Sequence, residues 1–272
     1  MDLFSSQPGS PSGTRSPVTF KRILLPAEHG SWALTFEPLA LGLLVVPSVA
    51  GAWLALSVAA AFLLRKPTKL AWGRGATRDP QVRAAAEKAA LLAGIVAAIS
   101  FGLAGIFAGY VPLLPLVSGI PAVVFFFWCD RTGRTRTLVA ELAGTLICSL
   151  PLFALALAAK WTVPAALALS SLSLARSVPT LLVIRTALRR AKDENVSIVP
   201  ALLVQIAVFL TQIVFAFLQC LPPRTVFIGF VLAARSAIYL SLGNRCPSAK
   251  RIGIAETGVG LAYLAAISWA FS

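Results

Sequence analysis

Residues that commonly ligate metals or act as acid–base catalysts are scarce in this sequence. It contains one histidine and four cysteines, and the cysteines form no CxxC pair. Structural zinc sites need four Cys or His ligands at short spacings, and a disulfide framework needs paired cysteines at readable spacings. We therefore expect no metal site, no bound cofactor and no disulfide framework, and we interpret the cysteines as small packing residues.

Charged residues are also few, at 12%, whereas 58% of residues are hydrophobic and the mean hydropathy is +0.84. A soluble domain usually carries about 25% charged residues, so the composition indicates an integral membrane protein in contact with lipids. Acidic residues are scarcest, with 10 Asp and Glu against 24 Lys and Arg. Such an excess would favour nucleic-acid binding in a soluble protein. Here basic loops held on the cytoplasmic side explain it, and no nucleic-acid partner is expected.

The chain divides into a short tail and one membrane domain. Residues 1–20 are rich in Ser, Pro and Gly and predict a disordered tail rather than a signal peptide. Residues 21–272 predict an all-α transmembrane helix bundle. Within it, the apolar run 29–64 would extend about 54 Å as one helix, against a hydrocarbon core of about 30 Å, so we expect it to divide at Pro47 and Ser48. The later spans are expected at 86–108, 111–128, 138–158, 163–184, 198–219, 224–243 and 254–271.

The basic residues support about nine spans. On this segmentation 20 Lys and Arg residues lie on the side of the N-terminus, and only Lys160 and Arg224 lie on the other. The distribution predicts a cytoplasmic N-terminus and an external C-terminus. The alternative treats 29–64 as one broken or re-entrant element, which gives eight spans and an external N-terminus.

Several ionisable residues fall inside the expected spans, in their cytoplasmic halves. A charged group near a bilayer centre costs on the order of 3 kcal/mol, so each needs compensation. In one interpretation the acids Glu37 and Glu141 pair with Arg176 and Arg235 and tie helices together. In the other, the two arginines hold an anionic group at the floor of a polar cavity open to the cytoplasm, because the guanidinium fork matches carboxylate or phosphate oxygens. Glu256 is a third buried acid.

Three further side chains are candidates for this site. Lys69 and Arg185, which flank the expected spans, either extend the anion site or only satisfy the topology. His29 and Glu37 are eight residues apart, about 80° around a helix, so one helix face can present an imidazole and a carboxylate as candidate catalytic groups. His29 can instead cap the start of its helix.

Short motifs lie along nearly the whole chain from residue 22. They are Pro26-x-Glu28-His29-Gly30-x-Trp32, Glu37-Pro38-Leu39, Arg65-Lys66-Pro67-x-Lys69, Asp130-x-x-Gly133-Arg134 with Glu141, Arg176-Ser177-Val178-Pro179 and Lys250-Arg251-Ile252-Gly253 with Glu256. Together they resemble the YwiC-like bacterial membrane proteins, and the opening motif is the most specific of them. Ala27 departs from the basic residue often found at that position. The resemblance implies a multi-pass protein of the bacterial cytoplasmic (inner) membrane and no particular activity.

Nine spans with polar residues on the cytoplasmic side are more weakly similar to the UbiA-type intramembrane prenyltransferases. Those enzymes hold magnesium and a prenyl diphosphate through aspartate-rich motifs after the second and sixth helices. In this sequence the two loops are basic and contain only Asp79 and the pair Asp193-Glu194. If the arrangement is shared, a diphosphate would have to be neutralised by Arg176, Arg235 and loop lysines.

The sequence leaves three functions open. The first is the binding of an amphiphilic anion, a lipid phosphate or isoprenoid diphosphate, in a cytoplasm-facing cavity, with a divergent prenyltransferase-like activity as its furthest extension. The second is transport of a small solute or anion through Arg176 and Arg235. The third is a non-catalytic membrane scaffold in which the buried charges are structural.

Overall fold

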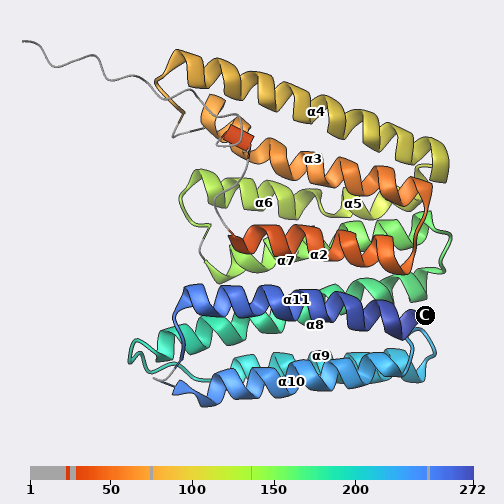
Figure 1. Ribbon diagram of the computed structural model, residues 1–272, viewed down its shortest axis with the longest axis vertical. Helices are drawn as coiled ribbons and strands as arrows, with labels where there is room; N and C mark the ends of the chain where they lie inside the picture. The colour runs from red at the N-terminus through yellow and green to blue at the C-terminus, as the bar shows by residue number, and fades with distance from the viewer. Residues whose placement is uncertain (1–22, 25–28, 74–75, 136, 244–245) are drawn as a thin grey trace, which may run out of the picture.

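The computed structural model describes residues 23–24, 29–73, 76–135, 137–243 and 246–272, and these are helical with no strand (Figure 1). The predicted tail at 1–20 lies outside the described residues. Eight segments of the described chain are long and apolar enough to cross a membrane, and α2 is a shorter apolar helix of 17 residues, about 26 Å in length. The helices are α2 (His29–Val45), α3 (Val49–Trp72), α4 (Pro80–Ala108), a broken segment of η1 (Val111–Leu113), α5 (Leu114–Ser118) and α6 (Ile120–Arg131), then α7 (Leu138–Ala158), α8 (Val163–Arg190), α9 (Val199–Phe217), α10 (Arg224–Ser241) and α11 (Ala249–Phe271). The predicted all-α bundle of about nine membrane helices is confirmed.

The apolar run 29–64 forms two helices rather than one. Helix α2 ends at Val45, and Ser48 caps the next helix by accepting a hydrogen bond from the Gly51 backbone nitrogen at 3.0 Å. A serine at this position satisfies an amide that has no partner inside its own helix. Figure 1 shows α2 and α3 running in opposite directions from this turn. The predicted division at Pro47 and Ser48 is therefore correct.

Helices extend further than predicted at one end of the bundle. Helix α3 continues to Trp72 instead of 64, α4 begins at Pro80 instead of 86, and α8 continues to Arg190 instead of 184. Arg, Lys and Gln are good helix formers, so these helices continue beyond the apolar segment until a cap ends them. Asp79 provides one such cap, because its side chain accepts from the Gln81 nitrogen at 2.9 Å. As a result, Lys69 and Arg185 lie on helices.

The two ends of the bundle differ in charge. We call the end that carries the connections after α3, α6, α8 and α10 the basic end, and Figure 1 shows it on the left. The opposite end carries the α2–α3, α4–η1, α7–α8 and α9–α10 turns and the C-terminus. Its described basic residues are Lys160 and Arg224. The remaining helix-terminal and loop cations of the described chain are at the basic end.

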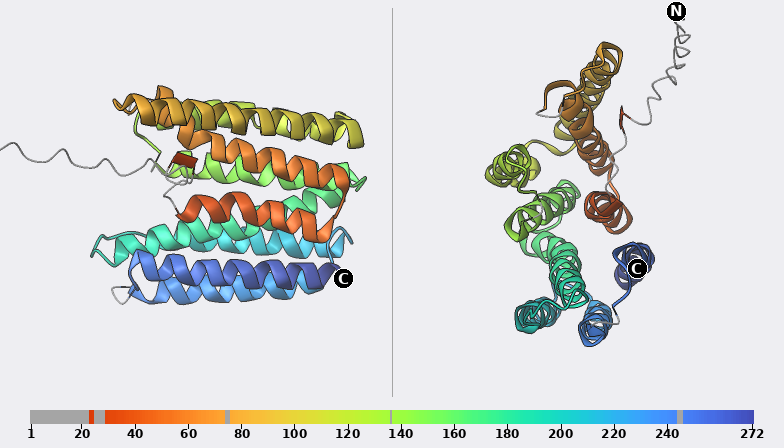
Figure 2. Two further views of the ribbon diagram at one scale, coloured as in Figure 1. Left: turned by 45° about the horizontal axis from the view of Figure 1, so that its top comes forward. Right: turned by 90° about the vertical axis from the view of Figure 1, so that its left-hand side faces the viewer.

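Helices α7 and α8 form the centre of the bundle. Seen end-on in Figure 2, they lie between α6 and α9, with α2 and α11 side by side along them and α4 outermost, packed on α3. Leu152 and Leu155 of α7 and Leu169 and Leu172 of α8 are fully buried. Close packing on α7 depends on Gly42 of α2, where a Cβ would lie 2.7 Å from the Leu155 side chain. This core fixes α2 and α11 against α8, where the buried charges meet.

Candidate functional site

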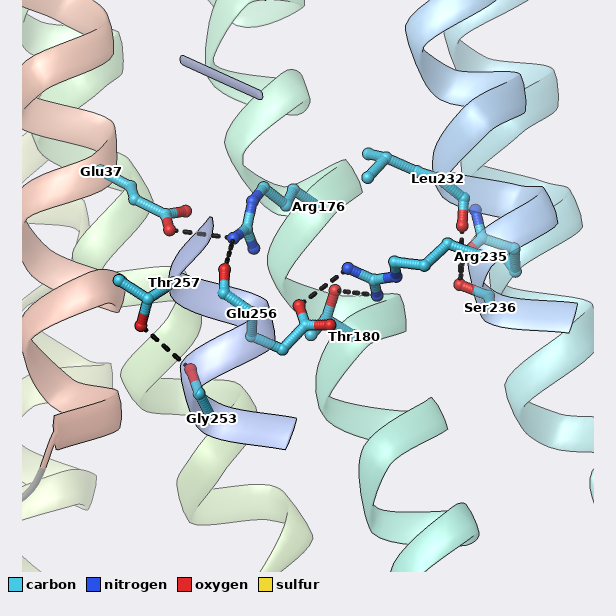
Figure 3. Close-up of polar contacts among 10 residues, drawn as sticks. Glu37, Arg176, Thr180, Leu232, Arg235, Ser236, Gly253, Glu256 and Thr257 are labelled. Carbon is cyan, nitrogen blue, oxygen red and sulfur yellow. Dashed lines mark hydrogen bonds and ion pairs between the residues drawn. The ribbon is translucent and has the colours of Figure 1, made fainter. Parts of the chain in front are cut away.

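A carboxylate, a guanidinium and a backbone carbonyl from three helices meet near the middle of α8. Arg176 of α8 donates from Nη2 to Glu37 Oε1 of α2 at 3.0 Å (Figure 3). The same Nη2 donates to the backbone oxygen of Glu256 in α11, also at 3.0 Å. These contacts join segments that are far apart in the sequence, so they can form only after α2, α8 and α11 have packed.

A second arginine extends the group to α10. Arg235 donates from Nη1 to Glu256 Oε2 at 2.8 Å and from Nη2 to Thr180 Oγ1 of α8 at 2.9 Å. We call Glu37, Arg176, Arg235 and Glu256 the central network. It connects four helices and contains two acids and two arginines, so its formal charges cancel. Figure 3 shows the two guanidinium groups on either side of Glu256.

Helix α11 is closely fitted to this network. Gly260 faces the Glu37–Arg176 pair, where a Cβ would contact Glu37 Oε1 and lie 2.7 Å from Arg176 Nη2. Tyr263, one turn further on, lies with its ring 5.8 Å from the Arg176 guanidinium carbon and donates its hydroxyl to the Leu172 carbonyl at 2.8 Å. The glycine allows close approach, and the tyrosine contributes a cation–π contact.

The central network has no room for a large ligand. The side chain of Arg176 is 6% exposed, and the adjoining cavity measures about 10 Å³. That volume is about the minimum needed for a single water. Within the described part of the chain, Arg176 Nε, Arg235 Nε and Glu256 Oε1 are buried without a hydrogen-bond partner. The contacts are those of the pairing interpretation for Glu37 and Arg176.

The predicted pairing partners are wrong for Glu141 and Arg235. Glu141 lies in the first turn of α7 at the basic end, where its Oε2 accepts from Arg185 Nη1 of α8 at 2.7 Å. Arg235 lies on α10, which packs on α8, α9 and α11, and there it meets Glu256. The sequence indicates how deep a residue lies in the membrane, but not which helices pack against each other. Helix packing determines which charged residues can pair.

A much larger cavity, which we call the basic-end pocket, lies between α2, α3, α6, α7 and α8. Its volume is about 620 Å³. The deep wall includes Thr35 and Cys148, whose Oγ1 and Sγ atoms are 3.6 Å apart. The charged lining residues, Arg65 and Glu141, lie toward the basic end, and most of the remaining wall is apolar. The lining consists of Leu34, Thr35, Ala61, Phe62, Leu64, Arg65, Thr68, Val123, Phe126, Phe127, Thr135, Glu141, Gly144, Ile147, Cys148 and Leu181.

Arg65 is the cation of this lining. Its guanidinium carbon lies 4.9 Å from the centre of the Phe126 ring, and its Nη2 lies 3.6 Å from Asp130 Oδ1. Lys69, one helical turn further along α3, donates to the same Asp130 oxygen at 2.9 Å. Two cations therefore share one carboxylate at the polar end of the pocket.

The predicted site residues thus separate into two places. Glu37, Arg176, Arg235 and Glu256 form the central network. Glu141 lines the basic-end pocket, Arg185 is paired with Glu141, and Lys69 is paired with Asp130 beside Arg65. The side chain of His29 lies outside the described part of the structure. Arg65 and Asp130 were not among the predicted site residues. The spacing of Arg65 and Lys69, four residues apart on one helix face, was the available signal.

Groups able to bind a metal ion do not gather in the described chain: no three or more His, Cys, Asp or Glu side chains come together there.

Residues 25–156 match the model of a family described as YwiC-like protein. This range contains every lining residue of the basic-end pocket except Leu181, whereas Arg176, Arg235 and Glu256 lie beyond it. No curated protein and no solved structure matches the chain, so the similarity to UbiA-type prenyltransferases has only the sequence pattern behind it.

Proposed function

We propose that this chain, whose residues 25–156 match the YwiC-like protein family model, is a multi-pass membrane protein that binds an amphiphilic anion in the basic-end pocket. The ligand would be a lipid phosphate or a molecule of similar chemistry. Its charged group would lie at Arg65 and its hydrocarbon part along the apolar wall. The proposal places the ligand beside Lys69 and Arg185 and leaves the central network as a structural element.

The observation that carries this proposal is the combination of a large apolar wall with a basic mouth. Ligand pockets usually measure about 300–1,000 Å³ and are mostly apolar with a few polar groups. The basic-end pocket, at about 620 Å³, has this size and distribution. The cavity at the central network, about 10 Å³, does not.

The charge at the mouth favours an anion. Arg65 and Lys69 share Asp130, so this group of three side chains keeps one positive charge in excess. A guanidinium presents planar, paired donors that match phosphate oxygens. Stacking on Phe126 holds the Arg65 guanidinium in place while leaving donors free to turn toward the pocket.

In the proposed orientation, this end of the pocket lies at the inner leaflet. With 20 Lys and Arg residues on the side of the N-terminus, the basic end would face the cytoplasm and the C-terminus would be external in a bacterial inner membrane. The phosphate headgroup of an inner-leaflet lipid would then lie at the same membrane depth as Arg65. Its acyl or isoprenoid chain would remain in the hydrocarbon layer.

The central network favours a scaffold role as the second candidate. It ties α2, α8, α10 and α11 together through compensated charges. Between the pocket and the opposite end, fully buried leucines such as Leu152 and Leu155 close the centre of the bundle. Transport along this axis would require the core to open.

Native mass spectrometry of the purified full-length protein tests the proposal. The wild-type protein should retain a phosphate-bearing amphiphile, and Arg65→Ala should reduce the retained fraction at least ~10-fold, since a charge-assisted contact is lost. Arg83→Ala is the matched control, because Arg83 lies at the same end but pairs with Glu87 on the surface of α4. Equal retention by wild type and Arg65→Ala would contradict the proposal.

A further inference from the structure

We propose that the basic-end pocket selects a phosphodiester headgroup carrying a single negative charge and discriminates against phosphomonoesters and diphosphates. This inference rests on the proposed function, since it specifies the ligand of the same pocket. The selectivity would come from Glu141, the carboxylate that lines the pocket together with Arg65 of α3.

We base the selectivity on the ion-paired side chains at the polar end of the pocket. Two side chains of α3, one of α6, one of α7 and one of α8 take part, and each is in an ion pair. They comprise three cations and two carboxylates, a net charge of +1 at neutral pH. A phosphodiester matches this charge, whereas a phosphomonoester dianion or a diphosphate leaves negative charge uncompensated. The five are Arg65, Lys69, Asp130, Glu141 and Arg185.

Glu141 weakens the binding of ligands with more than one negative charge, because its carboxylate is part of the pocket lining. Its Oε2 is held by Arg185 at 2.7 Å, so Arg185 is directed at the protein's own carboxylate. A second ligand charge in the pocket would be close to residues of both signs, because both Arg65 and Glu141 belong to the lining. Two like charges about 6 Å apart at an effective dielectric constant of about 20 repel each other by more than the equivalent of tenfold in affinity.

The wall of the pocket suits a lipid that remains partly in the bilayer. Phe127 belongs to the lining and is also 55% exposed, so the pocket opens on to the outer, lipid-facing surface of α6. The ends of long acyl chains can therefore extend into the hydrocarbon layer. Selection then depends on the headgroup, which is the part of the ligand next to Glu141.

Three lipids with identical dioleoyl chains test this inference: phosphatidylglycerol, phosphatidic acid and diacylglycerol pyrophosphate. Each is titrated at pH 7.5 into the delipidated full-length protein, and binding is followed by native mass spectrometry. We expect phosphatidylglycerol to bind at least ~10-fold more tightly than the other two. Wild-type binding of either of the other lipids as tightly as phosphatidylglycerol would overturn the inference.

The variant Glu141→Gln assigns the selectivity to this residue. It should raise affinity for phosphatidic acid and the pyrophosphate toward that for phosphatidylglycerol, whereas Glu87→Gln, in an exposed pair on α4, should leave the preference unchanged. An unchanged preference in Glu141→Gln would overturn the assignment. If none of the lipids binds and Arg65→Ala behaves as Arg83→Ala, the proposed function itself has failed. This result differs from equal binding of all three lipids, which would overturn only the selectivity.

Discussion

Glu37 and Arg176 are 139 positions apart in the sequence, and their side chains meet at 3.0 Å inside the bundle. The pair lies beneath Gly260 of α11 and is continued by Glu256 and Arg235. Both charges are largely buried, so each depends on the other for compensation. This dependence gives the first prediction.

Arg176→Ala should destabilise the protein strongly, because it leaves the Glu37 carboxylate buried without its partner. Removing one member of a buried pair typically costs about 3–5 kcal/mol. The double variant Glu37→Gln/Arg176→Gln should recover part of this loss. Thermal unfolding of purified variants measures the effect, with Arg83→Ala as a surface control expected to cost at most about 1 kcal/mol. Equal melting temperatures for Arg176→Ala and Arg83→Ala would show that the central network is not structural.

Two glycines of α11 offer a matched test of close packing. A Cβ at Gly260 would contact Glu37 and Arg176, whereas one at Gly258 meets no atom within 4 Å. Gly260→Ala should therefore destabilise the protein by about 1–3 kcal/mol through overpacking. Gly258→Ala should be neutral or slightly stabilising, since alanine is the better helix former. The measurement is the difference in melting temperature between the two variants. Equal melting temperatures would contradict the close packing of α11 against Glu37 and Arg176.

Much of the fold could be predicted from the sequence because apolar length and turn residues determine the spans. The division at Pro47 and Ser48 is one example. The helix ends at the basic end were missed because charged helix formers continue a helix beyond the bilayer. The pairs of Glu141 and Arg235 were assigned wrongly because residue depth carries no information about helix neighbours. The contacts of Arg65 were missed for the same reason: α6, which supplies Phe126 and Asp130, is not adjacent to α3 in the sequence.

Two native cysteines test the proposed orientation. Cys220 lies in the α9–α10 turn at the opposite end, and Cys246 lies between α10 and α11 at the basic end. A membrane-impermeant maleimide should label a variant that keeps only Cys220 in intact cells. It should label a variant that keeps only Cys246 only after the cells are permeabilised.

The labelling should also depend on pH. Burial raises the pKa of the Cys246 thiol, so its thiolate fraction at neutral pH is below that of an ordinary cysteine. The rate of Cys246 modification in permeabilised cells should therefore rise steadily as the pH is raised from 7 to 9. Labelling of Cys246 in intact cells would reverse the proposed orientation.

Solute flux separates ligand binding from transport. Proteoliposomes containing the wild-type protein should show no flux of small anions above that of protein-free vesicles, because buried leucines close the bundle beyond the pocket. Arg65→Ala should leave this background unchanged. A flux that disappears in Arg65→Ala, but persists in Arg83→Ala, would instead favour the transporter.

The most direct test of the central claim is to locate a bound lipid by photocrosslinking. A phosphatidylglycerol carrying a diazirine on one acyl chain is incorporated into nanodiscs with the full-length protein, and crosslinked peptides are mapped by mass spectrometry. The account predicts crosslinks concentrated on the pocket wall, at residues such as Leu34, Ile147 and Leu181, and their loss in Arg65→Ala but not in Arg83→Ala. Crosslinks spread over the outer surfaces of the helices, with none in the pocket, would contradict it.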